Sequence, residues 1–400
     1  MTGAAQAKTR IGPGWIVAIC FGVAALEGYD IQAFGVAAPR MAPDLGLDPQ
    51  QLGLAGGAAM MGLVAGAFLG GWLADRGGRR PVLAGSVALF GVFSVLTAFA
   101  QSYEMLFAAR LATGLGFGGA MPNLIAIATE ISPPNRRAAT TTSMFCGLPA
   151  GGALVALLAS SLGEALDWRT IFLIGGALPV LLAPVIWLFL PETRPAQDPT
   201  MDRNLGRALF GGGRTFATLM IWAIFALDLL ITYLLLNWLP TLVVAKGLSA
   251  SAGAAASLSM NVFSVAGALL LGALADRVGF RWPLVAVFLV LAVAMWGLAE
   301  AQALGAVLAW ASVAGFTVVG GLYVLYALAP AYYPPHMRAA GAGAAIAVGR
   351  FGSIAGPMIG GELRTIGFSA DQVFLTMIPA VLVAAVAILA LMSAARPHAD

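Results

Sequence analysis

The fold of this chain is decided by a charged stretch that reads Gly71-Trp72-Leu73-Ala74-Asp75-Arg76-Gly77-Gly78-Arg79-Arg80. A weaker copy runs from Gly272 to Arg281 and keeps Asp276 and Arg277, with Phe280 where the first copy has Arg79. Each copy joins two long apolar segments, and its glycines allow a tight turn and a close approach of helices. Asp75 can pair with the nearby arginines or cap a helix N-terminus, which predicts a gating latch. The alternative is a loop whose exposed charges only anchor it at a membrane surface.

The two copies belong to an internal repeat. Four further matches have the same offset of 201 residues: Ala25-Leu26-Glu27 with Ala226-Leu227-Asp228, Pro39 with Pro240, Gly46-Leu47 with Gly247-Leu248, and Arg137-Ala138-Ala139 with Arg338-Ala339-Ala340. Chance matches would not keep one offset along most of a chain. The repeat predicts two parallel bundles related by a pseudo-twofold axis, with helices one, four, seven and ten lining a cavity between them.

The composition is that of a membrane protein. Hydrophobic residues make up 60% of the 400 residues and charged residues only 10%, whereas soluble domains have about 25% charged residues. So few charges could not cover a water-facing surface of this size. The basic residues form no single stripe, so we expect no nucleic-acid partner. Two cysteines in separate apolar segments, with only His336 and His398 as histidines, predict neither a disulfide framework nor a metal site.

A spanning helix needs roughly 20 apolar residues, and twelve segments meet this length. They lie near 14–38, 51–74, 81–100, 104–129, 138–162, 168–190, 215–239, 251–275, 283–300, 303–330, 338–361 and 372–394. We therefore predict an all-α membrane protein with twelve transmembrane helices. Its parts are an N-terminal six-helix bundle at 1–190, a cytoplasmic central loop at 191–214 and a C-terminal six-helix bundle at 215–400.

The basic residues predict the orientation. One side of this topology holds Lys8, Arg10, Arg76, Arg79, Arg80, Arg136, Arg137, Arg194, Arg203, Arg207, Arg214, Arg277, Arg281, Arg338 and Arg396. The other side holds Arg40, Arg169, Lys246 and Arg364. Because basic residues favour the cytoplasmic side, we predict a multi-pass protein whose termini and central loop are both cytoplasmic.

The repeated loop resembles the signature loop of the major facilitator superfamily, G-x-x-x-D-R-x-G-R-R. Further motifs resemble the aromatic acid:proton symporter family along nearly the whole chain. They are Leu26 to Pro39, Arg110 to Asn123, Met144 to Gly147, Leu325 to Pro330, Tyr333-Pro334, Arg338-Ala339 and Gly349 to Gly352. Two positions depart from that pattern: Leu322, where the family often has glutamine, and Asp228, where we expect an uncharged residue.

The resemblance implies a transporter of a bacterial inner membrane that imports a small aromatic carboxylate with a proton, by alternating access. Carried over by position, it makes Glu27 and Asp30 the acidic pair of helix one. It makes Arg110 and Arg350 the basic residues of helices four and eleven. We expect a monomer surrounded by membrane lipid, with no cofactor other than the coupling proton.

The residues support this interpretation independently, because an ionisable side chain in a span usually faces a cavity or a partner. Glu27 and Asp30 are three apart and share one helix face, and two crowded acids raise each other's proton affinity. This predicts proton coupling, the alternative being a structural pair neutralised by an arginine. Asp228, the repeat counterpart of Glu27, is either a further proton site or a partner for Arg350.

Arg110 and Arg350 are the basic residues deep in the predicted spans. An arginine can hold a carboxylate with two parallel hydrogen bonds and stays charged throughout. We therefore predict substrate or coupling contacts for both, which would clamp the two bundles together. The alternative is a fixed ion pair with helix one or with Glu130.

Several polar and aromatic side chains on the predicted cavity helices complete the candidate site. Tyr233 with Asn237, and Ser257 with Asn261, are four apart and can each present one polar face. Tyr323 and Tyr326 are three apart and could stack on an aromatic ring. For each residue the alternative is ordinary hydrogen bonding and packing between helices.

Three function classes follow from the sequence. The first is a proton-coupled importer of aromatic acids, the second an exporter of drugs or metabolites on the same fold, and the third a substrate sensor that does not transport. The sequence contains no catalytic triad, metal cluster or phosphate loop, so we expect no enzyme.

Overall fold

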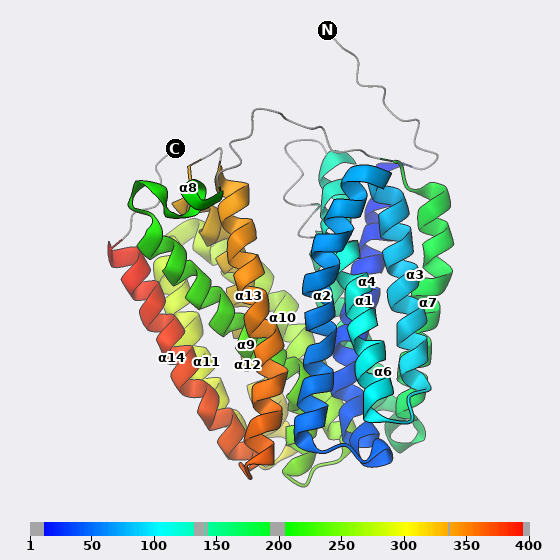
Figure 1. Cartoon of the computed structure of the whole chain (residues 1–400). Coiled ribbons are helices and arrows are strands. Elements are labelled where there is room, and N and C mark those ends of the chain that lie inside the picture. Colours follow the sequence, from blue (N-terminus) through cyan, green and yellow to red (C-terminus); the bar gives the residue numbers. More distant parts are fainter. Residues whose placement is uncertain (1–11, 132–139, 141–142, 193–204, 335–336, 395–400) are drawn as a thin grey trace. The chain divides into compact units, whose positions relative to one another are not determined.

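The computed structural model describes residues 12–131, 140, 143–192, 205–334 and 337–394. This part of the chain is helical and contains no strand. Eleven of its helical segments are long and apolar enough to cross a membrane, and α4 (Tyr103–Ile131) is a further long helix. The predicted all-α membrane fold is therefore confirmed (Figure 1).

The described residues form two compact units. The first takes its residues from Met1–Ala37, Ala58–Val155 and Leu166–Gln197, and the second from Ala38–Gly57, Ala156–Ala165 and Asp198–Asp400. The long helices of the N-terminal half are α1 (Pro13–Leu45), α2 (Pro49–Gly77), α3 (Arg79–Ala98), α4, α6 (Gly147–Leu162) and α7 (Trp168–Phe189). Those of the C-terminal half are α9 (Thr215–Ala245), α10 (Ala250–Val278), α11 (Arg281–Glu300), α12 (Leu304–Leu328), α13 (Arg338–Thr365) and α14 (Ala370–Ala394).

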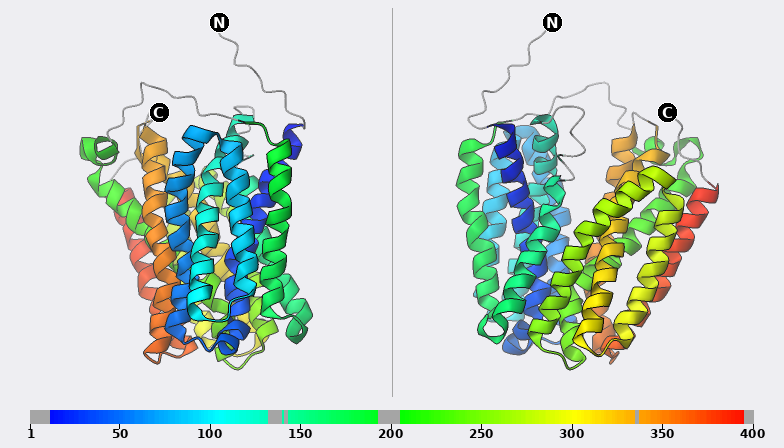
Figure 2. Two further views of the ribbon diagram at one scale, coloured as in Figure 1. Left: turned by 45° about the vertical axis from the view of Figure 1, so that its right-hand side comes forward. Right: turned by 180° about the vertical axis from the view of Figure 1, so that it is seen from behind.

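Within each unit the helices pack as neighbours in a bundle. In the first unit α3 contacts both α4 and α7. In the second unit α9 contacts α13 and α14, the orange and red helices of Figure 2. The short elements are η2 (Gly163–Ala165), α8 (Leu205–Phe210), η3 (Gly211–Gly213) and η4 (Ala329–Tyr332).

Local sequence signals fix where several helices begin and end. At the start of α2 the main-chain amides of Asp48 and Gln51 each donate a hydrogen bond to the other residue's side-chain oxygen, and Ser369 and Gln372 do the same at the start of α14. Such pairs satisfy amide groups that have no partner in the first turn of a helix. The repeat-related Gly46 and Gly247 follow α1 and α9 with φ of 63° and 92°, a backbone conformation that favours glycine.

Two helices continue through a proline at the end of the predicted span. The predicted spans lie near 14–38 and 215–239, and α1 and α9 continue through Pro39 and Pro240 to Leu45 and Ala245. A proline inside a helix removes one main-chain hydrogen bond, and membrane helices tolerate this where neighbouring helices cover the site. The prolines therefore lie within the helices and do not end them.

The internal repeat is reproduced in the helix packing. A Cβ on Gly114 of α4 would overlap the main-chain oxygen of Ala59 on α2. One repeat later, a Cβ on Gly315 of α12 would overlap the same atom of Met260 on α10. Glycine lets two helix backbones approach closely in lipid, and the 201-residue offset conserves this contact in both units.

The predicted central loop at 191–214 is only partly described. Residues 193–204 lie outside the described part of the chain, and α8 and η3 occupy most of the remainder. Also outside it are Lys8, Arg10, Arg136, Arg137, Arg194, Arg203, His336, Arg396 and His398, together with the side chains of Glu130 and Arg207.

We expect Gly114→Ala and Gly315→Ala each to lower the melting temperature of the purified protein in detergent. The added methyl group would meet a main-chain oxygen of the facing helix, and overpacking of this kind typically costs about 1–3 kcal/mol. Gly85→Ala on α3 is the matched control, because open space surrounds that position. Thermal unfolding followed by tryptophan fluorescence checks this, and equal melting temperatures for the three variants would contradict it.

Candidate functional site

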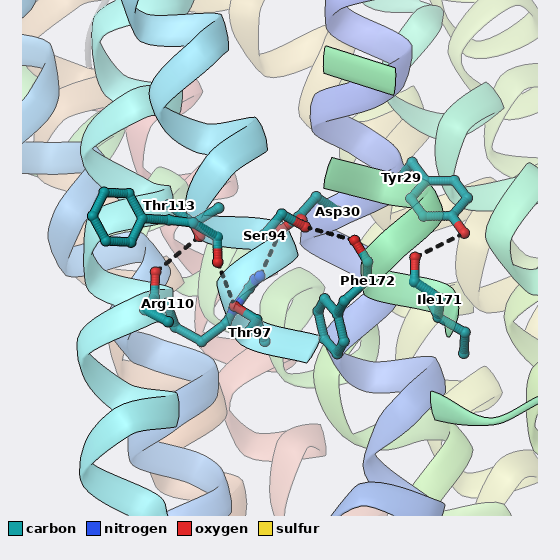
Figure 3. Close-up of polar contacts among 10 residues, drawn as sticks. Tyr29, Asp30, Ser94, Thr97, Arg110, Thr113, Ile171 and Phe172 are labelled. Carbon is teal, nitrogen blue, oxygen red and sulfur yellow. Dashed lines mark hydrogen bonds and ion pairs between the residues drawn. The ribbon is translucent and has the colours of Figure 1, made fainter. Parts of the chain in front are cut away.

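A buried ion pair joins α1 and α4 inside the first unit. Nη1 of Arg110 lies 2.5 Å from Oδ1 of Asp30, and the two side chains are 1% and 0% exposed. Ser94 of α3 donates a hydrogen bond to the other carboxylate oxygen, Oδ2 (Figure 3). Two neighbouring helices, α4 and α3, therefore supply the groups that neutralise and solvate this carboxylate of α1.

Aromatic rings surround the pair. The guanidinium carbon of Arg110 lies 5.5 Å from the ring centre of Phe34 and 5.6 Å from that of Phe172. The hydroxyl of Tyr29 donates a 3.2 Å hydrogen bond to the main-chain oxygen of Ile171 on α7. Nearby Thr97 and Thr113 bond to carbonyls of their own helices. Buried in these surroundings, either charge would be strongly destabilising without the other.

Glu27 lies one turn before Asp30 on α1 and is 1% exposed. Its carboxyl group and that of Asp30 are thus both withdrawn from solvent in the first unit. One alternative for the acids of helix one was that an arginine neutralises them, and Asp30 does have such a partner in Arg110 of α4. The sequence left open whether Arg110 pairs with helix one or with Glu130, and in the described structure it pairs with helix one.

A second polar cluster lies in the second unit, between α9, α12 and α13. Nη1 of Arg350 donates a 3.3 Å hydrogen bond to the hydroxyl of Tyr233. The ring of Tyr326 lies 5.6 Å from that of Phe225 and packs edge-to-face on Tyr323 at 6.2 Å. Arg350, Tyr323 and Tyr326 are all partly exposed. The cluster thus combines an accessible guanidinium with aromatic rings, a combination suited to an aromatic anion.

Asp228 of α9 belongs to the same neighbourhood. Its side chain is 0% exposed, and electrostatic interactions link Tyr326 to Asp228, Tyr233 and Arg350. Neither oxygen of its carboxyl group has a hydrogen-bond partner among the described residues.

Comparison with known proteins identifies the family to which this fold belongs. Residues 20–270 match the family model described as Major Facilitator Superfamily. The chain belongs to this superfamily. It is 39% identical to the 3-(3-hydroxy-phenyl)propionate transporter of Escherichia coli, over 94% of this chain and 93% of that protein. It is 34% identical to the 4-hydroxybenzoate transporter PcaK of Pseudomonas aeruginosa, over 94% of this chain and 91% of that protein.

A solved structure shares the fold. The crystal structure of a bacterial homologue of the human lysosomal transporter Spinster matches with a TM-score of 0.78 at 20% identity, covering 97% of this chain and 98% of that one. The predicted membership of the superfamily and the resemblance to aromatic-acid transporters are therefore confirmed. Both relatives are named as transporters of aromatic acids, and the superfamily is one of transporters, not enzymes.

In this superfamily member, the signature loop has a partner that the sequence did not predict. The main-chain amide of Arg79 donates a 2.8 Å hydrogen bond to Oε1 of Glu192, and Nε of Arg80 lies 3.9 Å from Oε2. Glu192 therefore caps the start of α3, next to Gly78, which has φ of 94°. Asp75 is exposed and has no ion pair among the described residues.

The arginines of both loop copies stack on tryptophans. The guanidinium carbon of Arg76 lies 3.9 Å from the ring centre of Trp72, and that of Arg281 lies 5.2 Å from Trp282. Asp276 and Arg277 of the second copy are exposed, and the described residues provide neither with an ion pair. The gating role of these loop residues stays a prediction.

The predicted polar faces on α9 and α10 bond partly to their own helices. The amide of Asn237 donates a 2.8 Å hydrogen bond to the carbonyl of Tyr233, and that of Asn261 donates one of the same length to Ser257. These bonds match the alternative of ordinary helix hydrogen bonding. The Tyr233 hydroxyl, in contrast, reaches another helix and contacts Arg350.

No motif or spacing in the sequence marks Ser94, Phe172 or Glu192 as members of the site. Ser94 is one small polar residue in an apolar helix, a pattern that is common for structural serines. Glu192 lies 113 residues from its partner Arg79, so no local spacing links them. The one available signal was a carboxylate directly after a span, where it can reach the end of a neighbouring helix.

We expect Arg110→Gln to lower the melting temperature strongly, because it leaves the Asp30 carboxylate buried without its cation. Removal of one partner of a buried pair typically costs about 3–5 kcal/mol. The double variant Asp30→Asn/Arg110→Gln should be more stable than Arg110→Gln alone, since it removes the carboxylate that would otherwise lack its cation. Arg350→Gln is the comparison and should cost less, because Arg350 is partly exposed. A double variant less stable than the single one would contradict this account.

Proposed function

We propose that this protein imports a small aromatic carboxylate together with protons, by alternating access, across a bacterial inner membrane with both termini in the cytoplasm. The observation that carries the proposal is the cluster of Arg350 with Tyr233, Tyr323, Tyr326 and Phe225. The names of the relatives specify hydroxylated aromatic acids, which have an anionic group and a ring for these two kinds of contact.

Arg350 is the proposed anchor of the substrate carboxylate. Its guanidinium is partly exposed and held by the Tyr233 hydroxyl, so its planar face is oriented before the substrate arrives. The rings of Tyr323 and Tyr326 stand at right angles to each other, 85° apart. A bound aromatic ring can contact one of them edge-to-face and stack on the other. Arg110, which already pairs with Asp30, is assigned to coupling instead of substrate anchoring.

Asp30 is the proposed coupling acid of the first unit. The ion pair with Arg110 is the proton-free form of this site. A proton on Asp30 would remove the charge that attracts Arg110, and Glu27, one turn earlier on α1, could then take over as its counter-ion. Proton binding would thus change which side chains hold α1 against α4. Ser94, which bonds to Asp30, would keep the carboxyl group positioned in both forms.

We expect proteoliposomes that contain the wild-type protein to accumulate labelled 3-(3-hydroxyphenyl)propionate when the outside is acidified. A protonophore should abolish this accumulation. Asp30→Asn should lose the accumulation but keep part of the exchange of labelled for unlabelled acid, because asparagine preserves the shape of the side chain without exchanging a proton.

Asp167→Asn is the matched control for this experiment. Asp167 is an exposed acid of the same half of the chain that caps α7, and asparagine caps helices equally well. This variant should accumulate substrate as the wild type does. Full accumulation by Asp30→Asn would show that Asp30 is structural. Outward pumping by the wild type would indicate an exporter, and binding without any flux would indicate a sensor.

The charge of the substrate provides a separate prediction for Arg350. The methyl ester of 3-(3-hydroxyphenyl)propionate keeps the ring and removes the charge, so it should bind more weakly than the acid. Arg350→Lys should lose most of this preference, because an ammonium group cannot form two parallel hydrogen bonds. Complete loss of a charged hydrogen-bonding partner costs about 2–5 kcal/mol, at least about tenfold in affinity, and this is the upper limit for Arg350→Lys because lysine keeps the charge. Isothermal titration of acid and ester measures both effects, and equal affinities for wild type would show that the carboxylate is not recognised.

A further inference from the structure

Asp228 is a buried acid whose role neither the fold nor the anchoring of a substrate explains. Its side chain is 0% exposed, and neither of its carboxyl oxygens has a hydrogen-bond partner among the described residues. A carboxylate in such a place is costly as an anion, whereas a protonated carboxyl group is much less so. A purely structural acid would be expected to bond to a neighbour, as Asp30 does to Arg110 and Ser94.

The groups around Asp228 come from three helices and meet at Tyr326 of α12. Electrostatic interactions link Tyr326 to Asp228 and Tyr233 of α9 and to Arg350 of α13. Two other helices, α10 and α14, pack against α9. The acid of α14, Asp371, pairs at 2.7 Å with Lys246, near the end of α9. The acid of α10, Asp276, is exposed in the loop copy.

Close packing places Arg350 at the level of Asp228. A Cβ on Gly349 would contact the side chains of Phe225 and Leu229, and one on Gly352 would overlap the main chain at Ala226. These two glycines flank Arg350 on α13, and their contacts lie on either side of Asp228 on α9. Among the described residues of the cluster, Arg350 is thus the cation whose position along the axis of α9 is nearest to that of Asp228.

We propose that Asp228 and the substrate carboxylate alternate as the counter-ion of Arg350, so that Asp228 carries a proton while the substrate is bound. This inference rests on the proposed function. In the loaded state, Arg350 is neutralised by the substrate, and Asp228 is a neutral acid. When the substrate leaves, Asp228 releases its proton to the aqueous phase, and its anion neutralises Arg350. The O–H bond of the carboxyl group is the one bond that breaks, and the cluster keeps the same net charge throughout.

This exchange would couple one proton to each substrate in the second unit, separately from Asp30. It also explains why an acid can occupy this position at little cost. In both states of the exchange, the cluster contains one cation and one anion, so no charge in the low-dielectric interior lacks a counter-ion. A fixed pair of Asp228 with Arg350 would, in contrast, leave no cation for a substrate carboxylate.

The test is the pH dependence of binding of 3-(3-hydroxyphenyl)propionate to purified wild-type and Asp228→Asn protein. In the wild type, the Kd should rise by up to about tenfold for each pH unit once Asp228 ionises and competes for Arg350. Asparagine cannot compete, so Asp228→Asn should bind more tightly than the wild type at high pH and should lose this rise. A structural role predicts the reverse, because loss of a structural acid would weaken binding at every pH.

Three further measurements keep the result unambiguous. Asp371→Asn, which removes an acid of the same unit outside the cluster, should keep the wild-type pH profile. Asp228→Glu should restore the rise, and it serves as the test if the asparagine variant does not fold. Infrared difference spectra between acid and alkaline pH should show a protonated carboxyl band that is absent in Asp228→Asn, a readout that needs no substrate.

The outcomes separate the two proposals. Identical pH profiles for wild type and Asp228→Asn, or the same infrared carboxyl bands in both, would overturn the exchange at Asp228 and leave the proposed function standing. Failure of the wild type to bind any of 3-(3-hydroxyphenyl)propionate, 4-hydroxybenzoate, gallate and benzoate would overturn the proposed function, and the exchange with it.

Discussion

A carboxylate and a guanidinium that are both shielded from water must neutralise each other, and the bond between Asp30 and Arg110 does so within the first unit. The apolar environment makes this bond strong and makes its loss costly. It ties α1 to α4, Ser94 adds α3, and the ring of Phe172 adds α7. Contacts of this one buried pair therefore connect four helices.

Close backbone contacts make such an arrangement possible. Lipid tails are as apolar as the side chains that face them, so moving apolar side chains from lipid into a helix interface stabilises it little. Helices in a bilayer therefore associate through tight packing and polar contacts. Glycines supply this packing: Gly175 of α7 leaves room for the ring of Tyr29, and Gly151 of α6 lies against the main chain of α1 at Ala25. Where these glycines let the helices meet, the buried polar groups come within hydrogen-bonding distance of one another.

Much of the fold could be predicted from the sequence because hydrophobicity and spacing are local properties. Each apolar run predicts its own span, and the offset of 201 residues predicts that the contact of Gly114 recurs at Gly315. The exact ends of the spans were less predictable, because α1 and α9 continue through Pro39 and Pro240 to Leu45 and Ala245.

The ionisable residues of the site could be predicted from the sequence, but the partners of these residues could not. Asp30, Arg110, Asp228 and Arg350 are conspicuous because charges in spans are rare. Their pairing depends on the rotation of each helix about its own axis, which a pattern of 3.6-residue periodicity defines only broadly. Hence the sequence could not distinguish helix one from Glu130 as the partner of Arg110, nor connect Glu192 with the start of α3.

The packing glycines follow the internal repeat, whereas the ionisable residues of the site do not. The packing glycines recur after 201 residues, yet the counterparts of Asp30 and Arg110 are Ile231 and Ala311, and the counterpart of Arg350 is Pro149. Duplicated packing gives each unit the same kind of scaffold, whereas each unit has its own arrangement of charges. The first unit has a closed ion pair, which suits a response to protons. The second has a partly exposed cation beside aromatic rings and a buried acid, which suits an exchange of anions. An aromatic anion differs from a proton in size, shape and charge, so the proposed transport of both requires two different half-sites.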